Sequence, residues 1–237
     1  MRTFLIVAVA ALTVIAVGGV AAVAQTPGAT MQVSVTPKNA GTKKKPKNSS
    51  IHLRIENADK TKTLRRLTIT SPKTFVLNAK GLTKCNEDEL ARTQDLSVCP
   101  KKSRVGSGTA HALVGVTGTN QTPLTFKVTA LVLGAKKLGF FLQGQELPVN
   151  VLSPGAIKGR KLIIDVPIEA QQPTPGLWAG LVDLETTMKA KQGKHILAST
   201  MGCKKKNHGF GALLEFADNT GTGAPAPISV SAPSKCS

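Results

Sequence analysis

Apolar and polar side chains alternate one for one along most of the chain, and this pattern constrains the fold more than any other feature. In residues 51–56 (IHLRIE), Ile51, Leu53 and Ile55 take one set of alternate positions, while polar side chains take the other. Because successive side chains of a β-strand point to opposite faces, such alternation is typical of a strand with one buried face. The pattern returns in 124–134, 161–169, 177–189 and 211–218. We therefore predict an all-β protein.

Segments rich in Gly, Pro and Asn separate the predicted strands. They include 57–62, 134–137, 153–155, 171–176, 192–193 and 219–223. Strands at this spacing are typical of an antiparallel β-sandwich, in which alternate side chains of each strand point into a shared core. We expect the inward positions to include Leu162, Ile164, Val166 and Ile168 in one strand and Trp178, Val182, Leu184 and Met188 in another.

Residues 1–24 are predicted to be a secretory signal peptide. Arg2 precedes an apolar stretch, and Ala22 and Ala24 supply the small residues expected before a cleavage site that follows Ala24. A transmembrane anchor is the alternative, since the apolar stretch reaches about 20 residues. No basic cluster follows the stretch directly, which favours cleavage. No other segment is apolar for long enough to span a bilayer, so we expect an exported protein without a membrane span in its mature form.

The rest of the chain divides into two predicted parts. Residues 25–50 contain a strand-like run at 31–36 and a loop rich in Lys and Pro. Residues 51–237 form the predicted β-sandwich domain, to which 28–36 can add a strand. An exported protein folds in an oxidising compartment, so the four cysteines suggest two disulfides.

Residues 84–110 (KCNEDELARTQDLSVCPKKSRVGSGTA) contain Cys85 and Cys99, with thirteen residues between them. Zinc knuckles and thioredoxin-type sites need closely spaced Cys pairs, which this chain lacks. A phosphate-binding P-loop needs Lys after its glycines, whereas here the basic residues come first. We therefore predict a structural Cys85–Cys99 disulfide that closes a loop around one short acidic helix at 86–91. Gly106 and Gly108 then mark a strand at a tightly packed or bulged position.

The same stretch resembles a group of uncharacterised secreted proteins from soil bacteria that share a GLxxC…CPxxSxxGxGxA core. The matching residues are Gly81, Leu82, Cys85, Cys99, Pro100, Ser103, Gly106, Gly108 and Ala110. The resemblance covers residues 64–110 and, more weakly, the last 40 residues. It implies export, a β architecture and a second disulfide between Cys203 and Cys236, and it implies no biochemical activity.

No catalytic motif is present in the sequence. His52, His111, His195 and His208 are isolated from one another, and none belongs to a known hydrolase or metalloprotease pattern. Two carboxylate pairs, Asp165 with Glu169 and Asp183 with Glu185, are each expected on one strand face. Sugar-cleaving enzymes usually add aromatic platforms, but this chain has no Tyr and one Trp. We predict a protein that is not an enzyme and uses no cofactor or metal; a secreted hydrolase with an unrecognised site is the alternative.

The chain is strongly basic, with a formal net charge of +18. Its lysines and arginines occur in clusters, several of them in predicted turns, so they could line one end of the domain. A positive field of this kind attracts polyanions. The candidate binding residues are Lys101, Lys102, Arg104, Lys158, Arg160, Lys161, Lys204, Lys205 and Lys206.

Three explanations of the charge remain open. The protein can be a binding or structural module for an anionic cell-envelope polymer, it can bind nucleic acid, or its charge can serve solubility alone. Proteins that bind single-stranded nucleic acid usually interleave aromatic residues for base stacking, and such residues are scarce here.

Overall fold

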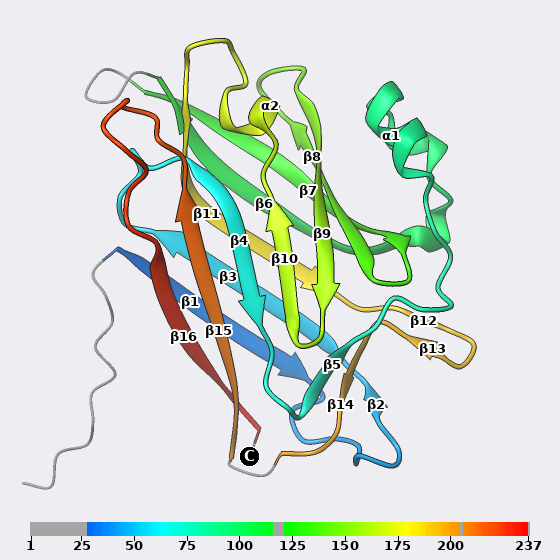
Figure 1. Ribbon diagram of the computed structural model, residues 1–237. Helices are drawn as coiled ribbons and strands as arrows, with labels where there is room; N and C mark the ends of the chain where they lie inside the picture. Colours follow the sequence, from blue (N-terminus) through cyan, green and yellow to red (C-terminus); the bar gives the residue numbers. More distant parts are fainter. Residues whose placement is uncertain (1–27, 116–120, 204–205, 237) are drawn as a thin grey trace, which may run out of the picture.

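The computed structural model describes residues 28–115, 121–203 and 206–236; the predicted signal peptide at 1–24 lies outside this part. Its main feature is one antiparallel sheet of eleven strands, all joined in a continuous ladder (Figure 1). In the order in which they pair, the strands are β1 (Ala29–Thr36), β3 (Ser50–Asn57), β11 (Ala179–Met188), β6 (Arg104–Val114), β7 (Thr122–Gly134), β8 (Lys137–Gly144), β9 (Asn150–Lys158), β10 (Lys161–Asp165), β4 (Leu64–Thr70), β15 (Asn207–Phe216) and β16 (Ile228–Lys235).

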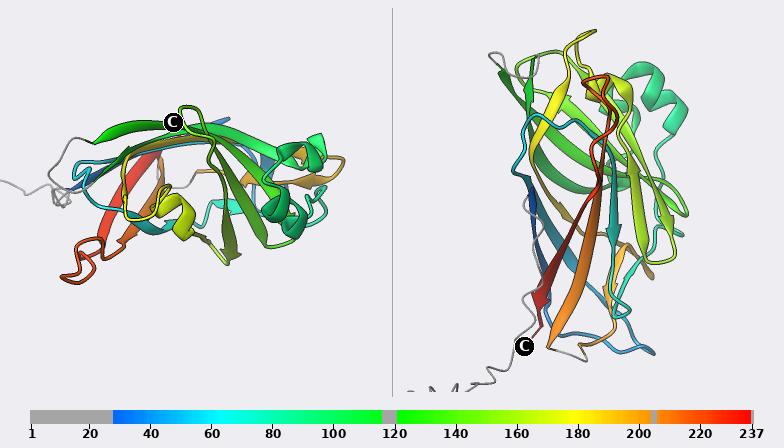
Figure 2. Two further views of the ribbon diagram at one scale, coloured as in Figure 1. Left: turned by 90° about the horizontal axis from the view of Figure 1, so that it is seen from above. Right: turned by 60° about the vertical axis from the view of Figure 1, so that its left-hand side comes forward.

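The sheet curls on itself until its two edge strands, β1 and β16, lie side by side (Figure 2). All neighbours in the ladder are antiparallel, and the number of strands is odd, so β1 and β16 run in the same direction. The all-β, antiparallel prediction is confirmed. The predicted division into two packed sheets is not found in the described residues, because the eleven main strands all pair within one ladder. The result is a nearly closed, barrel-like sheet.

Short strands close one end of this barrel-like sheet. β2 (Lys47–Asn48) and β5 (Phe75–Leu77) both pair with β14 (Ala198–Thr200), and β12 (Lys191–Gln192) forms a hairpin with β13 (His195–Ile196). All five lie at the bottom and lower right of Figure 1. Phe75 of β5 is buried and makes an edge-to-face contact with Phe210 of β15, with 5.3 Å between ring centroids. Aromatic packing of this kind joins the short strands to the main core.

Side chains at alternate positions of each strand fill the interior. In β1 the pattern is regular, with Ala29, Met31, Val33 and Val35 buried and the residues between them exposed. We expected residues 28–36 as a possible additional strand. They contain β1, which is one of the eleven strands of the main sheet. The interior face of the sheet is therefore the principal hydrophobic core.

A β-bulge in β11 changes which of its residues point inward. The pairing with β6 shifts between Leu181 and Asp183, so Val182 is an extra residue without an opposite partner. Ala179 and Leu181 consequently share the inner face with Leu184 and Met188. Our assignment of Val182 to that face is wrong for this reason. Trp178, also expected inward, precedes β11 and is only half-buried.

The strand predicted at 161–169 is shorter than its sequence pattern suggests. β10 ends at Asp165, and Pro167 begins the short helix α2 (Ile168–Gln171). A proline cannot donate the hydrogen bond that a continued strand would need. Ile168 therefore lies in α2 with 52% of its surface exposed, instead of pointing into the core as expected.

The disulfide loop covers part of the outer face of the sheet. Helix α1 (Glu87–Thr93) starts at Asn86, whose side chain accepts a hydrogen bond from the Glu89 N–H, and the 3-10 turns η1 (Leu96–Val98) and η2 (Lys101–Ser103) follow. Cys85 and Cys99 are joined, with 4.8 Å between their Cα atoms. Leu90 of α1 packs outside the sheet against Leu131 and Phe141. Residues 130–133 of β7 are apolar on both faces, because the interior core covers one face and the disulfide loop covers the other. Among the described residues, no helix is long and apolar enough to cross a membrane.

Candidate functional site

The antiparallel ladder brings most of the basic residues to one end of the sheet. Lys158 pairs with Lys161, Lys161 with Thr70, and Asn207 with Lys235, so the turns that carry these residues share an end. We define the basic end as the connections 37–49, 71–74, 101–104, 134–137, 158–161 and 189–203 together with residues 206 and 235–236. Each connection contains Lys or Arg, and none contains Asp or Glu. These segments lie along the bottom and the right-hand side of Figure 1.

The structure places all the described candidate residues at this end. Lys101 and Lys102 lie in η2, Arg104 begins β6, and the segment 158–161 forms the hairpin turn between β9 and β10. Their side chains are all exposed, and so is that of Lys206. Lys204 and Lys205 lie outside the described residues. Lys73 and Lys235 also belong to the basic end. Each is isolated in the sequence, so the clusters of basic residues did not identify them as candidates.

Two of the candidate arginines donate hydrogen bonds to backbone carbonyls. Arg104 donates to the Leu96 oxygen over 3.0 Å, and Arg160 donates to the Ser71 oxygen over 3.0 Å. A carbonyl oxygen carries no formal charge. These bonds therefore orient the guanidinium groups while leaving their positive charge available to a ligand.

Several carboxylates form ion pairs elsewhere in the molecule. At the end opposite the basic end, Lys62 lies 3.4 Å from Asp59, Arg65 lies 3.3 Å from Glu215, and Arg66 pairs with Asp165. The hydrogen bond to Asp165 raises the pKa of Arg66. Within the described part of the chain, Lys137 with Glu87 is the one ion pair at the basic end, and it ties α1 to the sheet. The other basic groups described there lie within 4 Å of no carboxylate.

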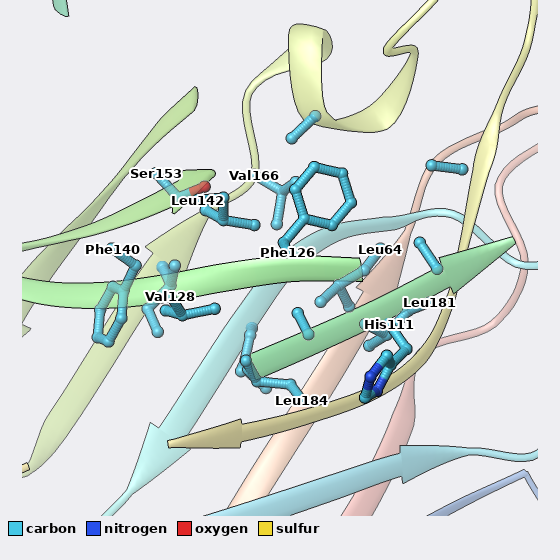
Figure 3. A pocket seen from close by; sticks show the side chains of 16 residues that line it. Leu64, His111, Phe126, Val128, Phe140, Leu142, Ser153, Val166, Leu181 and Leu184 are labelled. Carbon is cyan, nitrogen blue, oxygen red and sulfur yellow. The ribbon is translucent and has the colours of Figure 1, made fainter. Parts of the chain in front are cut away.

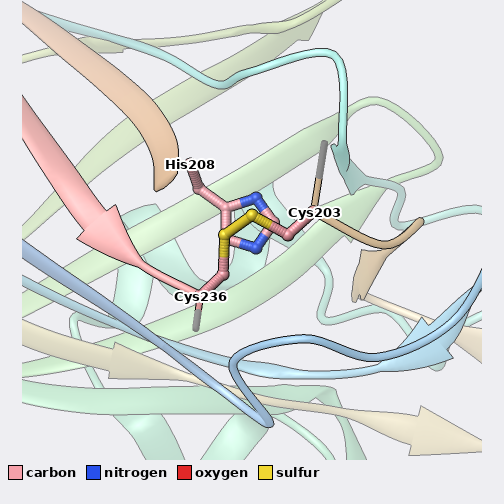
Figure 4. Close-up of side chains that lie close together, drawn as sticks. All are labelled: Cys203, His208 and Cys236. Carbon is pink, nitrogen blue, oxygen red and sulfur yellow. A yellow bond between two sulfur atoms is a disulfide. The ribbon is translucent and has the colours of Figure 1, made fainter. Parts of the chain in front are cut away.

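A second cluster at the basic end consists of Cys203, His208 and Cys236 (Figure 4). Cys203 and Cys236 form the second disulfide, with 6.1 Å between their Cα atoms, so both predicted pairings are confirmed. The fully buried His208 ring lies beside it. Its Nε2 donates to the Lys38 carbonyl over 3.1 Å, and its Nδ1 is 2.8 Å from the Thr74 hydroxyl. Because both sulfurs and both ring nitrogens already have partners, this cluster joins neighbouring segments and leaves no ligand atom free for a metal.

Two further histidines face acids on the outer side of β11. His111 Nδ1 lies 2.8 Å from Asp183, and His52 lies 3.0 Å from the Thr187 hydroxyl. His52 Nε2 is also 3.7 Å from Glu185, so a hydroxyl, an imidazole and a carboxylate stand in a row. Acyl transfer would also need N–H donors for an oxyanion. β11 pairs with β3 on one side and β6 on the other, so its backbone donors along this row are engaged in the ladder.

Of the two carboxylate pairs that we expected on shared strand faces, one lies on such a face and the other does not. Asp183 and Glu185 lie on the outer face of β11, where each faces a histidine. Asp165 and Glu169 do not share a strand, because Glu169 belongs to α2, and Asp165 is bound to Arg66. Neither pair converges across a cleft as glycoside hydrolysis requires.

No protein-family model matches the chain, and no curated protein shows significant similarity to it. No solved structure matches the fold significantly.

Proposed function

We propose that this protein is an exported, non-catalytic binding or structural module that holds an anionic polymer of the cell envelope at its basic end. The observation that supports this proposal is the separation of charge along the sheet. Exposed lysines and arginines occupy the connections at one end, whereas Asp59, Asp165, Glu215 and Asp218 lie toward the other. A polymer of repeating negative charge can contact several such connections at once.

The proposal relies on many weak contacts rather than on one pocket. An exposed ion pair is worth at most about 1 kcal/mol, because water and salt screen it. Exposed charges farther apart than about 8 Å are mostly screened at physiological salt, so each lysine acts on the phosphate or carboxylate nearest to it. A polymer that releases counterions along its length adds these contributions together. Affinity should therefore depend strongly on salt concentration.

The aromatic residues favour a polymer of phosphate or carboxylate groups over single-stranded nucleic acid. All six phenylalanines in the described residues are buried: Phe75, Phe126, Phe140, Phe141, Phe210 and Phe216. Base stacking on a protein surface needs exposed aromatic rings. The basic end therefore offers charge without a stacking platform.

The test is a binding measurement with purified poly(glycerol phosphate) teichoic acid at about 50 and 200 mM salt. We expect the affinity of the wild-type protein to fall at least about tenfold between the two conditions. The triple variant Lys101→Glu, Lys158→Glu and Lys161→Glu should bind at least about tenfold more weakly at low salt, because all three side chains are exposed at the basic end. Salt-independent binding, or no binding to any polyanion, would refute the proposal.

A matched control separates position from net charge. Lys60→Glu, Arg92→Glu and Lys127→Glu change the net charge by the same amount, and all three side chains are exposed away from the basic end. We expect this variant to keep most of its affinity. Equal losses in both variants would mean that net charge, and not the basic end, governs binding. Tighter binding of single-stranded DNA than of teichoic acid would favour nucleic acid as the ligand.

A further inference from the structure

The interior of the barrel-like sheet contains an apolar pocket at the end opposite the basic end (Figure 3). Its volume is about 100 Å³. Side chains from eight elements line it, namely β4, β6, β7, β8, β9, β10, β11 and α2. His111 borders the pocket, but its imidazole is bonded to Asp183 on the outer face. No Lys, Arg, Asp or Glu belongs to the lining.

The pocket exists because several inward positions carry small side chains. Ala110 and Ala112 of β6 and Ala179 of β11 point toward the same space as Phe126 and Leu142. Protein interiors are normally filled to the density of organic crystals, with few voids larger than a water molecule. Water is a poor occupant of an apolar cavity, because such a cavity offers it no hydrogen-bond partners. The space is therefore suited to an apolar ligand.

The pocket is open on the side where apolar side chains reach the surface. Leu142, Val166, Leu181 and Leu184 all line it, and all four are only partly buried. Ile168 of α2, the helix whose Ala170 lines the pocket, is 52% exposed. An apolar ligand can thus pass from the surface to the interior along continuous apolar contacts.

We propose that this pocket binds the end of one hydrocarbon chain of an uncharged amphiphile, such as a long-chain alcohol. An apolar cavity of about 150 Å³ holds benzene in another protein, so a cavity of this size takes several carbon atoms but no fused-ring ligand. The absence of charged groups from the lining excludes a charged head group from the interior, because burying an unpaired charge is costly. The head group must therefore remain at the mouth.

The shape of the lining favours a chain over a ring. Phe126 and Val128 of β7 line the pocket two residues apart, and so do Phe140 and Leu142 of the neighbouring β8, in which Leu142 lies opposite Val128. Two residues of a strand span about 7 Å, so the pocket extends along the strand direction. Ser153, which lies opposite Phe140 in the ladder, contributes the one hydroxyl of the lining. This site is at the other end of the sheet from the basic end, so it does not depend on the proposed polymer binding.

The test is a titration of the protein with 1-alkanols, followed through the methyl resonances of its leucines and valines. We expect saturable shifts for Leu142, Val166 and Leu181. Affinity should rise about fourfold for each added methylene until the chain fills the pocket, and should then level off. Non-saturable shifts, or equal shifts of methyl groups throughout the protein, would overturn the proposal.

Variants make the test specific to the pocket. Ala110→Leu should reduce alkanol affinity by about tenfold or more, because the new side chain occupies the space. Ala112→Val is a smaller change that serves if Ala110→Leu does not fold. The matched control is Ala156→Leu, since Ala156 lies on the outer side of β9 between the buried Gly155 and Ile157. Equal affinity in Ala110→Leu and Ala156→Leu would refute the site. Shifts produced by neutral phosphatidylcholine vesicles but not by alkanols would also refute it, because a membrane would then cover the rim without filling the pocket.

Discussion

Lys158 and Lys161 stand directly opposite each other across the hairpin that joins β9 and β10, and both side chains are exposed. Like charges in directly opposed positions of an antiparallel pair destabilise it by about 0.2–1 kcal/mol. We predict that Lys161→Glu raises the free energy of unfolding by a few tenths of a kcal/mol to about 1 kcal/mol while it weakens polyanion binding. Thermal unfolding and teichoic-acid binding, measured on the same protein, check the two opposite effects. A variant that loses both stability and binding would contradict this account of the hairpin.

The Cys85–Cys99 disulfide should stabilise the protein by fixing the loop that covers the outer face of β7 and β8. In the chain-entropy model, a loop of this size is worth about 3 kcal/mol. We expect the double variant Cys85→Ser, Cys99→Ser to lose about that much free energy of unfolding in urea titrations. Protease cleavage within 86–98 should accelerate as Leu90 separates from Leu131 and Phe141. Unchanged cleavage in this segment would mean that α1 packs on the sheet without help from the disulfide.

Gly108 confirms the prediction of a tightly packed strand position. A Cβ atom added there would lie closer to the Glu185 carbonyl oxygen and the Thr186 backbone of β11 than real contacts allow. We predict that Gly108→Ala lowers the free energy of unfolding by about 1–3 kcal/mol, because β6 must move away from β11. The control is Gly209→Ala in β15, where an added Cβ meets no atom within 4 Å. That variant should stay within about 1 kcal/mol of wild type in the same chemical denaturation assay.

The hydrogen bonds of Asp59 predict that the free energy of unfolding falls in acid. Its carboxylate accepts hydrogen bonds from the Thr61 hydroxyl at 2.6 Å and the Thr61 N–H at 3.1 Å. These bonds, with Lys62 nearby, hold the pKa of Asp59 below its usual value, although partial burial opposes the shift. A carboxyl group whose pKa is lower in the folded state stabilises the protein above the unfolded pKa, near 3.9. That contribution is lost as the pH falls through the folded value.

The measurement for Asp59 is urea unfolding between about pH 7 and pH 2. Asp59→Asn should be less stable than wild type at neutral pH, and the two proteins should converge in acid. Thr61→Val removes the hydroxyl but keeps the carboxylate and should give an intermediate pH dependence. Parallel curves for wild type and Asp59→Asn would show that Asp59 has the same pKa in both states.

The sequence pattern predicted individual strands better than it predicted how they assemble. Alternation in 51–56 and 211–218 corresponds to β3 and β15, because each of these strands has one face on the core and keeps its phase to the end. It failed in β11, where the bulge at Val182 exchanges the two faces within one strand. A bulge depends on the neighbouring strand, and nothing in the local alternation of 177–189 records it.

The sequence pattern also did not predict that the sheet curls until its two edge strands lie side by side. Period-two alternation is the same for a strand in a sandwich and for a strand in a curled sheet, because both have one buried face. A sandwich and a curled sheet differ in whether β16 lies beside β1. These two strands are almost 200 residues apart in the chain. The location of the basic end was easier to anticipate, since clusters such as 101–104 and 158–161 fall in turns and turns collect at the ends of an antiparallel sheet.

The parallel neighbours β1 and β16 also determine how the protein should respond to force. Gly28 precedes β1 at one end of the sheet, and Cys236 follows β16 at the other. Tension applied between these residues would act along both strands, at right angles to the hydrogen bonds that join β1 to β3 and β16 to β15. All bonds of each ladder would then share the load in shear, instead of breaking one after another. The Cys203–Cys236 bridge would pass part of that load to the segment before β15.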